Sequence, residues 1–470
     1  MADLDAPSHA GRNVVLALIV LIIIFFAVVL GRGRAPAIIA KAWPAAVGRH
    51  LTLPLTVRDA AGVRAVRVEY LQGGKTLTVA RAGSGVRYWL SAPVAERQLT
   101  LAARIGAGDV AGLKDGPAVL VVRAVAANLR GATTTLRRPV LVRTQPPMIS
   151  PLTTRLYIHQ GGCQMVVYRL AEPGGGSLAG VRSGVRFDGH FFPGYRLRGA
   201  TPGTRFALFA MPYNAPLSAL PRLVARDQAG NQAVANFPVT TLASHYRTRP
   251  FRVSDAFIAQ VVTPIIRNTP GLQMPATPLA EFLLVNGPLR QSDARQLARV
   301  SHVSAHRFYW RGAFLPLPHS AVEARFADHR LDMYDGKVVQ QDDHLGYDLA
   351  SVEHAPIPAA NAGRVVWAKY FGIYGNSVLI DHGYGLMSLY GHMNDFAVHP
   401  GQMVRKGQII GHTDSTGLAA GDHLHFSMLL DGVQMNPVDW WDASWVRSRI
   451  GAKLRAFGGP NVAPAATAGQ

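Results

Sequence analysis

Residues 421–432 read Gly-Asp-His-Leu-His-Phe-Ser-Met-Leu-Leu-Asp-Gly. A short apolar run between Gly-Asp and Asp-Gly pairs predicts a β-strand bounded by two turns. Side chains two positions apart in a strand project from the same face, so His423 and His425 should lie side by side. Leu424 and Phe426 should then face the core. The segment therefore predicts a strand that presents two imidazoles together at one surface of a sheet.

The surrounding chain repeats this pattern of short apolar runs and glycine-rich turns. Such runs occur at 364–368, 377–380 and 408–411. They are too short for helices of ordinary length, and their spacing predicts an antiparallel β structure. We therefore expect residues 331–445 to form one β domain.

Two further motifs in this domain carry side chains suited to metal and proton chemistry. Residues 344–348 read His-Leu-Gly-Tyr-Asp, and Gly346 allows the chain to bend so that an imidazole and a carboxylate converge. Residues 390–392, Tyr-Gly-His, add another histidine. Each motif alone is weak, but together with 421–432 they supply three groups able to hold a divalent metal and two histidines able to move protons. This set predicts an open hydrolytic zinc site with one position left for water.

A longer run of sequence agrees with a known family. The agreement lies in His-Leu-Gly-Tyr-Asp-Leu-Ala (344–350), Pro-Ala-Ala-Asn-Ala-Gly-Arg-Val-Val (358–366), Tyr-Gly-Asn-Ser-Val-Leu-Ile-Asp-His-Gly (374–383), Leu-Tyr-Gly-His-Met (389–393), the glycine turns of 398–411, Ser-Thr-Gly (415–417), His-Leu-His-Phe (423–426) and Asn-Pro (436–437). These segments resemble the lysostaphin-type, or LytM-like, zinc endopeptidases, which cut the peptide cross-links of bacterial peptidoglycan. The resemblance covers about a quarter of the chain.

The resemblance implies a fold of two stacked sheets, with Zn²⁺ in a groove across one of them. The implied zinc ligands are His344, Asp348 and His425. The implied catalytic residues, which do not bind the metal, are His392 and His423. A zinc-activated water would attack the scissile amide, while one histidine accepts a proton and the other stabilises the oxyanion and protonates the leaving amine. No His-Glu-x-x-His occurs in the chain, so this proton transfer would fall to histidine.

Several residues near the site have competing interpretations. His382 is expected to support the site from a turn rather than to bind the metal. Tyr390 would share a strand face with His392 and either line the groove or pack in the core. The residues do not assign the separate roles of the two catalytic histidines.

Two functional classes remain open. The first is an active zinc endopeptidase whose partners are peptidoglycan stem peptides. The second is a catalytically silent LytM-like envelope scaffold that recruits or activates another cell-wall hydrolase. Because all five polar site residues are present, we favour the enzyme. The residues do not indicate which cross-link bond is cut.

The N-terminal region contains an apolar segment. Residues 14–30 carry no charge and no proline, and the run is longer than the usual apolar core of a cleaved signal. We expect a signal anchor here, with residues 1–13 in the cytoplasm. The protein would then be a single-pass protein of the cell inner membrane, with its catalytic domain in the periplasm or cell envelope. Cleavage after Ala35-Pro36-Ala37 is the alternative.

The middle of the chain predicts two further β domains. Residues 50–143 contain repeated short strands in which apolar and charged side chains alternate, typical of a small immunoglobulin-like β-sandwich. Gln145-Pro146-Pro147 predicts a linker, and 150–246 a second β domain. We expect both domains to act as spacers or as modules that bind the cell wall.

The sequence pattern changes from strand-like to helix-like in residues 250–330. Thr277-Pro278 followed by Asn286-Gly287 has the capping pattern of a helix, so we expect a short helical connector. One hypothesis is that this connector, or residues 326–330, packs over the groove and restrains the enzyme. The other is that Asp328 to Arg330 only form an edge of the groove. Residues 446–470 are rich in Ala, Gly and Pro and predict a disordered tail.

Composition limits the possible partners. The formal net charge is +20 and the sequence pI about 10.6, which favours anionic surfaces such as phospholipid or peptidoglycan carboxylates. The charge is spread over the β domains and no nucleic-acid-binding motif occurs, so we expect no nucleic acid partner. The single cysteine, Cys163, excludes an intramolecular disulfide.

Overall fold

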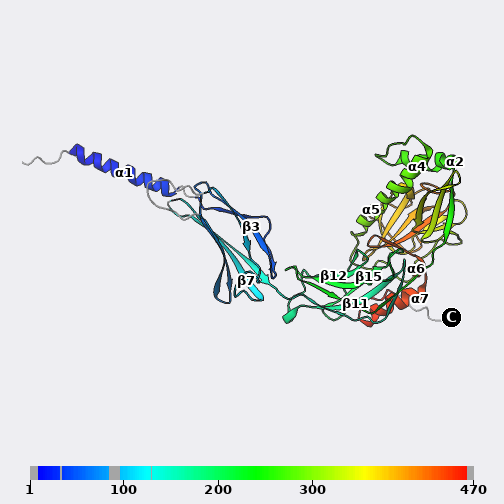
Figure 1. Ribbon diagram of the computed structural model, residues 1–470, viewed down its shortest axis with the longest axis horizontal. Coiled ribbons are helices and arrows are strands. Elements are labelled where there is room, and N and C mark those ends of the chain that lie inside the picture. Colours follow the sequence, from blue (N-terminus) through cyan, green and yellow to red (C-terminus); the bar gives the residue numbers. More distant parts are fainter. Residues whose placement is uncertain (1–8, 32–33, 84–95, 129, 463–470) are drawn as a thin grey trace, which may run out of the picture. The chain divides into compact units, whose positions relative to one another are not determined.

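Residues 9–31, 34–83, 96–128 and 130–462 are described in a computed structural model of the chain (Figure 1). They form two compact units, Met1–Pro147 with Arg226–Gln232 and Met148–Ala225 with Ala233–Gln470. The structure is mainly β, as the sequence predicts.

Helix α1 (His9–Gly31) contains the segment predicted as a membrane anchor, 14–30, and some side chains of that segment lie outside the described residues. Among the residues that are described, no helix has the length and hydropathy needed to span a membrane. The first eight residues of the predicted cytoplasmic segment, 1–13, also lie outside the description.

Two sheets form the β part of the first unit. Their strands are β1 (Ala37–Ala40), β2 (Ala46–Val47), β3 (Thr52–Arg58), β4 (Val63–Gln72), β5 (Lys75–Ala82), β6 (Gln98–Arg104), β7 (Gly116–Ala126) and β8 (Thr133–Val142). The sheet orders are β1-β3-β6 and β2-β8-β7-β4-β5. Leu55 of β3 and Val68 of β4 are fully buried in one shared core, and Arg67 is exposed beside it. This alternation is the reason that the two sheets bury one face each against the other.

The second unit begins with another set of β-sheets. Its first strands are β9 (Met148–Pro151), β10 (Leu156–His159), β11 (Cys163–Ala171), β12 (Arg182–Phe187), β13 (His190–Pro193), β14 (Tyr195–Arg196), β15 (Thr204–Ala210), β16 (Arg222–Arg226), β17 (Gln232–Ala235) and β18 (Val239–Leu242). Two four-stranded sheets have the orders β14-β15-β11-β9 and β13-β12-β16-β17, and β10 pairs with β18. Buried aromatic side chains such as Phe187 and Phe209 join the two larger sheets.

Helices occupy only part of the predicted connector. They are α2 (Asp255–Phe257), η2 (Ile258–Val262), α3 (Thr263–Asn268), α4 (Pro278–Leu284), η3 (Val285–Leu289) and α5 (Arg290–Ser301). The ends of the 250–330 segment are strands instead: β19 (Thr248–Val253), β20 (Ala321–Ala324) and the start of β21 (Asp328–Tyr334). Both β19 and β20 are largely exposed, so no apolar alternation marks them in the sequence.

The remaining strands build the sheets that carry the predicted site. They are β22 (Lys337–His344), β23 (Tyr347–Ala350), β24 (Pro356–Pro358), β25 (Gly363–Tyr370), β26 (Asn376–Gly383), β27 (Leu386–Gly391), β28 (Met403–Val404), β29 (Ile409–His412), β30 (Leu424–Leu430) and β31 (Val433–Met435). The largest sheet runs β20-β23-β30-β27-β26-β25-β28, with β31 beside β30, and all its pairs are antiparallel. Smaller sheets have the orders β19-β21-β22 and β24-β29.

Both faces of the largest sheet are covered. Leu379 and Leu429 belong to a core that also contains Phe282 and Leu297 of the helices, which lie beside these strands (Figure 1). Neighbouring residues on the opposite face, such as Ile380, belong to the core shared with the β9–β18 sheets. Strands buried on two faces read as nearly continuous apolar runs, as β26 and β30 do.

The prediction that residues 446–470 are disordered is wrong for residues 446–456, which form helices. The chain continues through α6 (Val438–Trp441), α7 (Ala443–Trp445), η5 (Val446–Gly451) and α8 (Ala452–Ala456). Val446, Ile450 and Leu454 are fully buried. Their spacing of four residues makes one apolar stripe along a helix. The stripe is hard to recognise in the sequence because Ala, Gly and Arg residues surround these three positions. Residues 463–470 lie outside the described part.

Candidate metal centre

Three adjacent strands bring the predicted site residues together. Asp348 of β23 pairs with His425 of β30, and His425 pairs with Gly391 of β27 on its other side. His392 directly follows Gly391. His423 directly precedes β30 and lies on the same side of the strand as His425, as their spacing predicts.

His344 reaches the same point from the end of β22. The turn to β23 contains Gly346, where a Cβ atom would lie 2.5 Å from the His425 ring. Glycine is therefore needed here because the backbone passes directly against that imidazole. The turn also places His344 and Asp348 on one centre although they come from strands of different sheets.

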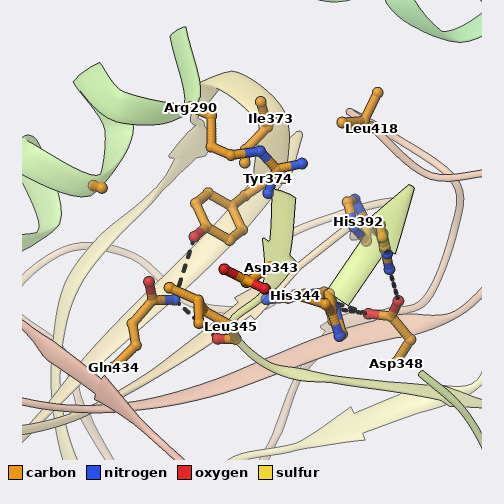
Figure 2. A pocket seen from close by; sticks show the side chains of 13 residues that line it. Arg290, Asp343, His344, Leu345, Asp348, Ile373, Tyr374, His392, Leu418 and Gln434 are labelled. Carbon is orange, nitrogen blue, oxygen red and sulfur yellow. Dashed lines mark hydrogen bonds and ion pairs between the residues drawn. The ribbon is translucent and has the colours of Figure 1, made fainter. Parts of the chain in front are cut away.

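The centre consists of three atoms in mutual contact. His344 Nε2 lies 2.9 Å from Asp348 Oδ1 and 3.1 Å from His425 Nδ1, and His425 Nδ1 lies 3.0 Å from Asp348 Oδ1. All three side chains are nearly buried. Figure 2 shows His344 and Asp348 at the base of the cavity, with His392 beside them.

Hydrogen bonds to the outer nitrogens fix the tautomers of the histidines. The outer partners are Arg325 O for His344 Nδ1 (3.1 Å), Thr416 O for His392 Nδ1 (2.7 Å), Gly421 O for His423 Nδ1 (2.8 Å) and Ser427 Oγ for His425 Nε2 (2.9 Å). A carbonyl oxygen only accepts, so the ring nitrogen facing it must donate. Ser427 donates its own hydrogen to Leu345 O at 2.7 Å, so it accepts from His425. The nitrogen facing the centre is then the unprotonated one in each neutral ring.

This tautomer pattern fits a metal ion. The three contacting atoms of His344, Asp348 and His425 are all acceptors, and acceptors at 2.9–3.1 Å need a cation or proton between them. Two imidazoles and one carboxylate form a ligand set suited to zinc with an open fourth position. The outer hydrogen bonds hold each ring in the orientation that a metal ligand requires.

The charge states agree with this arrangement. Without a metal ion, burial would raise the pKa of Asp348, but protons held between it and His344, His423 and His425 outweigh burial and keep the pKa well below its usual range. Burial lowers the pKa of His425 to about 4. Near neutral pH the centre therefore presents an ionised carboxylate and a neutral imidazole, the forms that bind metals.

The two remaining histidines face the centre from the side. The rings of His392 and His423 lie 4.8 Å apart, and His423 Nε2 lies 3.5 Å from Asp348 Oδ1. Burial, with the neighbouring histidines, holds the pKa of His392 well below its usual value. Burial also lowers that of His423, but the hydrogen bond and charge of Asp348 more than reverse this. The pair thus offers two imidazoles whose proton affinities are shifted in opposite directions beside one centre.

The cavity over the centre is lined by residues from outside the predicted motifs. Arg290 extends over it from α5 and Tyr374 forms part of its wall, with Gln434 Nε2 at 3.4 Å from Tyr374 Oη (Figure 2). Arg330 Nη2 donates to Asp348 Oδ2 at 3.2 Å. Of the lining residues named here, only Arg330 lies in a segment, Asp328 to Arg330, that the sequence predicts at the edge of the groove. Lone arginines and a glutamine carry no spacing signal that would identify them from the sequence.

Other residues near the site have structural roles. His382 is fully buried, with its ring nitrogens 2.8 Å from Ala362 O and 2.7 Å from Ser388 Oγ. Burial lowers its pKa to about 4. Tyr390 is a core residue whose hydroxyl accepts from Ala360 N at 2.7 Å. Of the two roles considered for Tyr390, the structure shows the core role.

The site is therefore a His/Asp/His group that could hold a metal ion, with a histidine pair beside it, and known proteins provide a comparison for the segment that carries it. Residues 342–437 match peptidase family M23. This chain carries a peptidase M23 domain.

Two curated relatives illustrate the match. The DD-carboxypeptidase/endopeptidase Mpg of Neisseria meningitidis serogroup B is 38% identical over 95 residues, which cover 20% of this chain and 22% of that protein. The peptidoglycan DD-endopeptidase ShyC of Vibrio cholerae serotype O1 is 35% identical over 127 residues, covering 27% and 29%. This chain thus spans less than a third of the length of these relatives. Among solved structures, the catalytic domain of the antimicrobial peptidase lysostaphin from Staphylococcus simulans is 24% identical, covering 27% of this chain and 94% of that chain with a TM-score of 0.24.

Proposed function

We propose that this protein is a zinc-dependent endopeptidase that hydrolyses the peptide cross-links of bacterial peptidoglycan. The observation that carries the proposal is the contact of three acceptor atoms, from His344, Asp348 and His425, beside the histidine pair. The names of the relatives, a DD-carboxypeptidase/endopeptidase and a peptidoglycan DD-endopeptidase, support peptidoglycan as the substrate class.

The chain's own residues would share the work of the reaction. His344, Asp348 and His425 would hold the zinc ion, which when bound supplies the Lewis acidity that activates water and polarises an amide carbonyl. The unprotonated nitrogens of His392 and His423 face this centre and can accept a proton from water or return one to the leaving amine. Their outer hydrogen bonds, to Thr416 O and Gly421 O, keep both rings aimed at the reacting atoms.

Paired variants test the division between ligand and catalytic residue. His344→Ala should lose both bound zinc and cleavage of cross-linked sacculi. His392→Ala should keep its zinc but lose about 10²–10⁴-fold in cleavage rate. His399→Ala, at an exposed histidine of the same domain, is the matched control and should change neither quantity. Zinc content is measured by mass spectrometry of the purified protein and cleavage by analysis of released muropeptides.

One outcome would overturn the proposal in favour of the silent scaffold. If the wild-type protein carries a full complement of zinc and releases no cleaved stem peptides from sacculi, the endopeptidase assignment fails. Stimulation of a second wall hydrolase by the same preparation would then identify the scaffold role.

We also propose that the domain acts in the periplasm or cell envelope, because its proposed substrate lies there, and that the uncharged apolar run 14–30 holds the chain at the inner membrane. Protease treatment of spheroplasts should degrade the M23 domain without lysis. Protection of the domain until the cells are lysed would contradict this localisation.

A further inference from the structure

A second cavity in the same unit lies away from the metal centre. It has a volume of about 490 Å³ and is lined by Tyr195, Arg196, Arg198, Gly199, His306 and Tyr384. The first four come from β14 and the turn that follows it. His306 belongs to the segment after α5, and Tyr384 to the turn between β26 and β27.

Three aromatic rings form a fixed wall of this cavity. The ring of Tyr195 lies 4.9 Å from that of His306 and 4.7 Å from that of Tyr384. Phe206 and Phe308 pack behind Tyr384 with ring centroids at 5.0 and 4.6 Å. The rings are thus supported from below by other aromatics and present edges and faces to the cavity.

Tyr384 is also held in an unusual backbone conformation. Its φ is +55°, in the left-handed region that tyrosine seldom adopts, and its backbone N donates to Ala305 O at 2.7 Å. Tyr384 and Gly385 are the two central residues of the hairpin turn that joins β26 to β27, and such a turn requires a positive φ at both positions, so the turn fixes where the tyrosine ring lies.

The rim of the cavity is positively charged. Arg196 and Arg198 are exposed, and within the described residues neither has a hydrogen bond or ion pair to a carboxylate. Two acidic residues lie beneath the rings, Asp381 and Asp431, and neither lines the cavity. The Asp381 carboxylate accepts hydrogen bonds from the backbone nitrogens of Ala305 and Gly383, at 3.0 and 2.8 Å.

We propose that this cavity binds a carboxylate-bearing sugar of the peptidoglycan glycan strand, at a position where the lactyl carboxylate is free because no stem peptide is attached to it. Aromatic rings offer flat apolar surfaces to the C–H faces of a sugar ring, and guanidinium groups bind a carboxylate through paired charged hydrogen bonds. The peptidoglycan identity of the ligand rests on the proposed function.

The position of the cavity separates binding from cleavage. Tyr384 precedes β27 and His392 follows it, which puts the two on the order of 25 Å apart along one extended strand. The cavity therefore holds the polymer at a point remote from the bond that is cut, and none of its residues contacts the metal ligands.

Glycan strands freed of their stem peptides are a suitable probe, because they keep the lactyl carboxylates and contain no cleavable peptide bond. Binding of fluorescent strands to the full-length protein is measured by anisotropy. The double variant Arg196→Gln/Arg198→Gln should weaken binding about tenfold or more, the size expected for loss of charged hydrogen bonds. The control Arg182→Gln/Arg186→Gln changes the charge equally at two exposed arginines of β12 outside the cavity and should leave binding within about twofold.

Each other outcome would overturn the inference. Equal weakening by both double variants would indicate general charge attraction, and tighter binding of a single-stranded oligonucleotide would indicate another ligand class. A fall in melting temperature for the Arg196/Arg198 variant would give these residues a structural role instead.

A separate assay distinguishes this inference from the proposed function. Cleavage of soluble cross-linked stem peptides without glycan should be the same for wild type and both double variants. Absence of cleavage together with intact glycan binding would refute the endopeptidase alone. Cleavage without any glycan binding would refute the second site alone.

Discussion

Arg330 anchors the carboxylate oxygen of Asp348 that faces away from His344 and His425. Its guanidinium donates to Asp348 Oδ2, while Oδ1 contacts both of these histidines. Its guanidinium also lies 5.8 Å from the ring centroid of Phe251, which restrains its position. Arg330 is thus a positioning residue that acts through Asp348.

We expect Arg330→Gln to lower zinc affinity about 10–100-fold, because hydrogen-bond partners of metal ligands contribute that much to binding. Competition with a chromophoric chelator measures the affinity without reference to activity. Arg364→Gln, at an exposed arginine of β25, is the control and should bind zinc as the wild type does. Equal affinities for wild type and Arg330→Gln would show that Asp348 needs no such anchor.

The sequence identified the residues that meet at the centre but not those that arrange them. The sequence predicts that His423 and His425 lie side by side, because side chains two positions apart in a strand share a face. It does not predict the tautomers of the site histidines. These depend on carbonyl groups such as Thr416 O, which faces His392, and Gly421 O, which faces His423, and the folded backbone sets the positions of both. Arg290 and Arg330 approach from other elements and have no motif of their own.

At the scale of elements, the turn between β30 and β31 contains a buried carboxyl group. Asp431 is almost completely buried there, with φ at +45°, and burial raises its pKa to about 8. The folded state therefore keeps a proton that the unfolded chain releases near its usual pKa of 3.8. Because the folded state binds more protons across this window, the free energy of unfolding should fall as pH rises from about 4 to 8.

Asp431→Asn should flatten this part of the pH profile, because the amide is neutral at every pH and asparagine tolerates the same backbone conformation. The wild-type slope attributable to Asp431 is at most about 1.4 kcal/mol per pH unit. Denaturant unfolding of both proteins at several pH values measures the difference. Asp188→Asn, in an exposed Asp-Gly turn with φ at +43°, is the matched control. Parallel profiles for wild type and Asp431→Asn would refute the burial argument.

Elements with strong periodicity were predictable and edge elements were not. The runs at 364–368, 377–380 and 408–411 fall in β25, β26 and β29, because buried strands must be apolar. β19 and β20 lie at the borders of their sheets with most side chains exposed, so their sequences resemble loops. Strand order in the large sheet depends on which distant segments pair, and no local pattern specifies that.

At the scale of the whole molecule, the C-terminal segment joins parts of the second unit that are distant in sequence. Val446, Ile450 and Leu454 belong to one core together with residues of β11 and β30. Lys453 Nζ donates to Gln164 Oε1 at 3.0 Å and to Met165 O at 2.9 Å. Residues 150–246, predicted as a separate domain, therefore share a core with the M23 domain, and the end of the chain completes that core.

Ile450→Ala should accordingly destabilise the entire second unit and not only its last helix. Removal of a fully buried isoleucine side chain costs about 2–5 kcal/mol. Tryptophan fluorescence reports mainly on this unit, because five of the seven tryptophans lie in it: Trp310, Trp367, Trp440, Trp441 and Trp445. The control Val438→Ala, at an exposed residue of α6, should stay within about 0.5 kcal/mol of wild type. A loss for Ile450→Ala no larger than that of the control would mean that the C-terminal helix contributes no stability to the core, and that the β sheets of 150–246 fold independently of it.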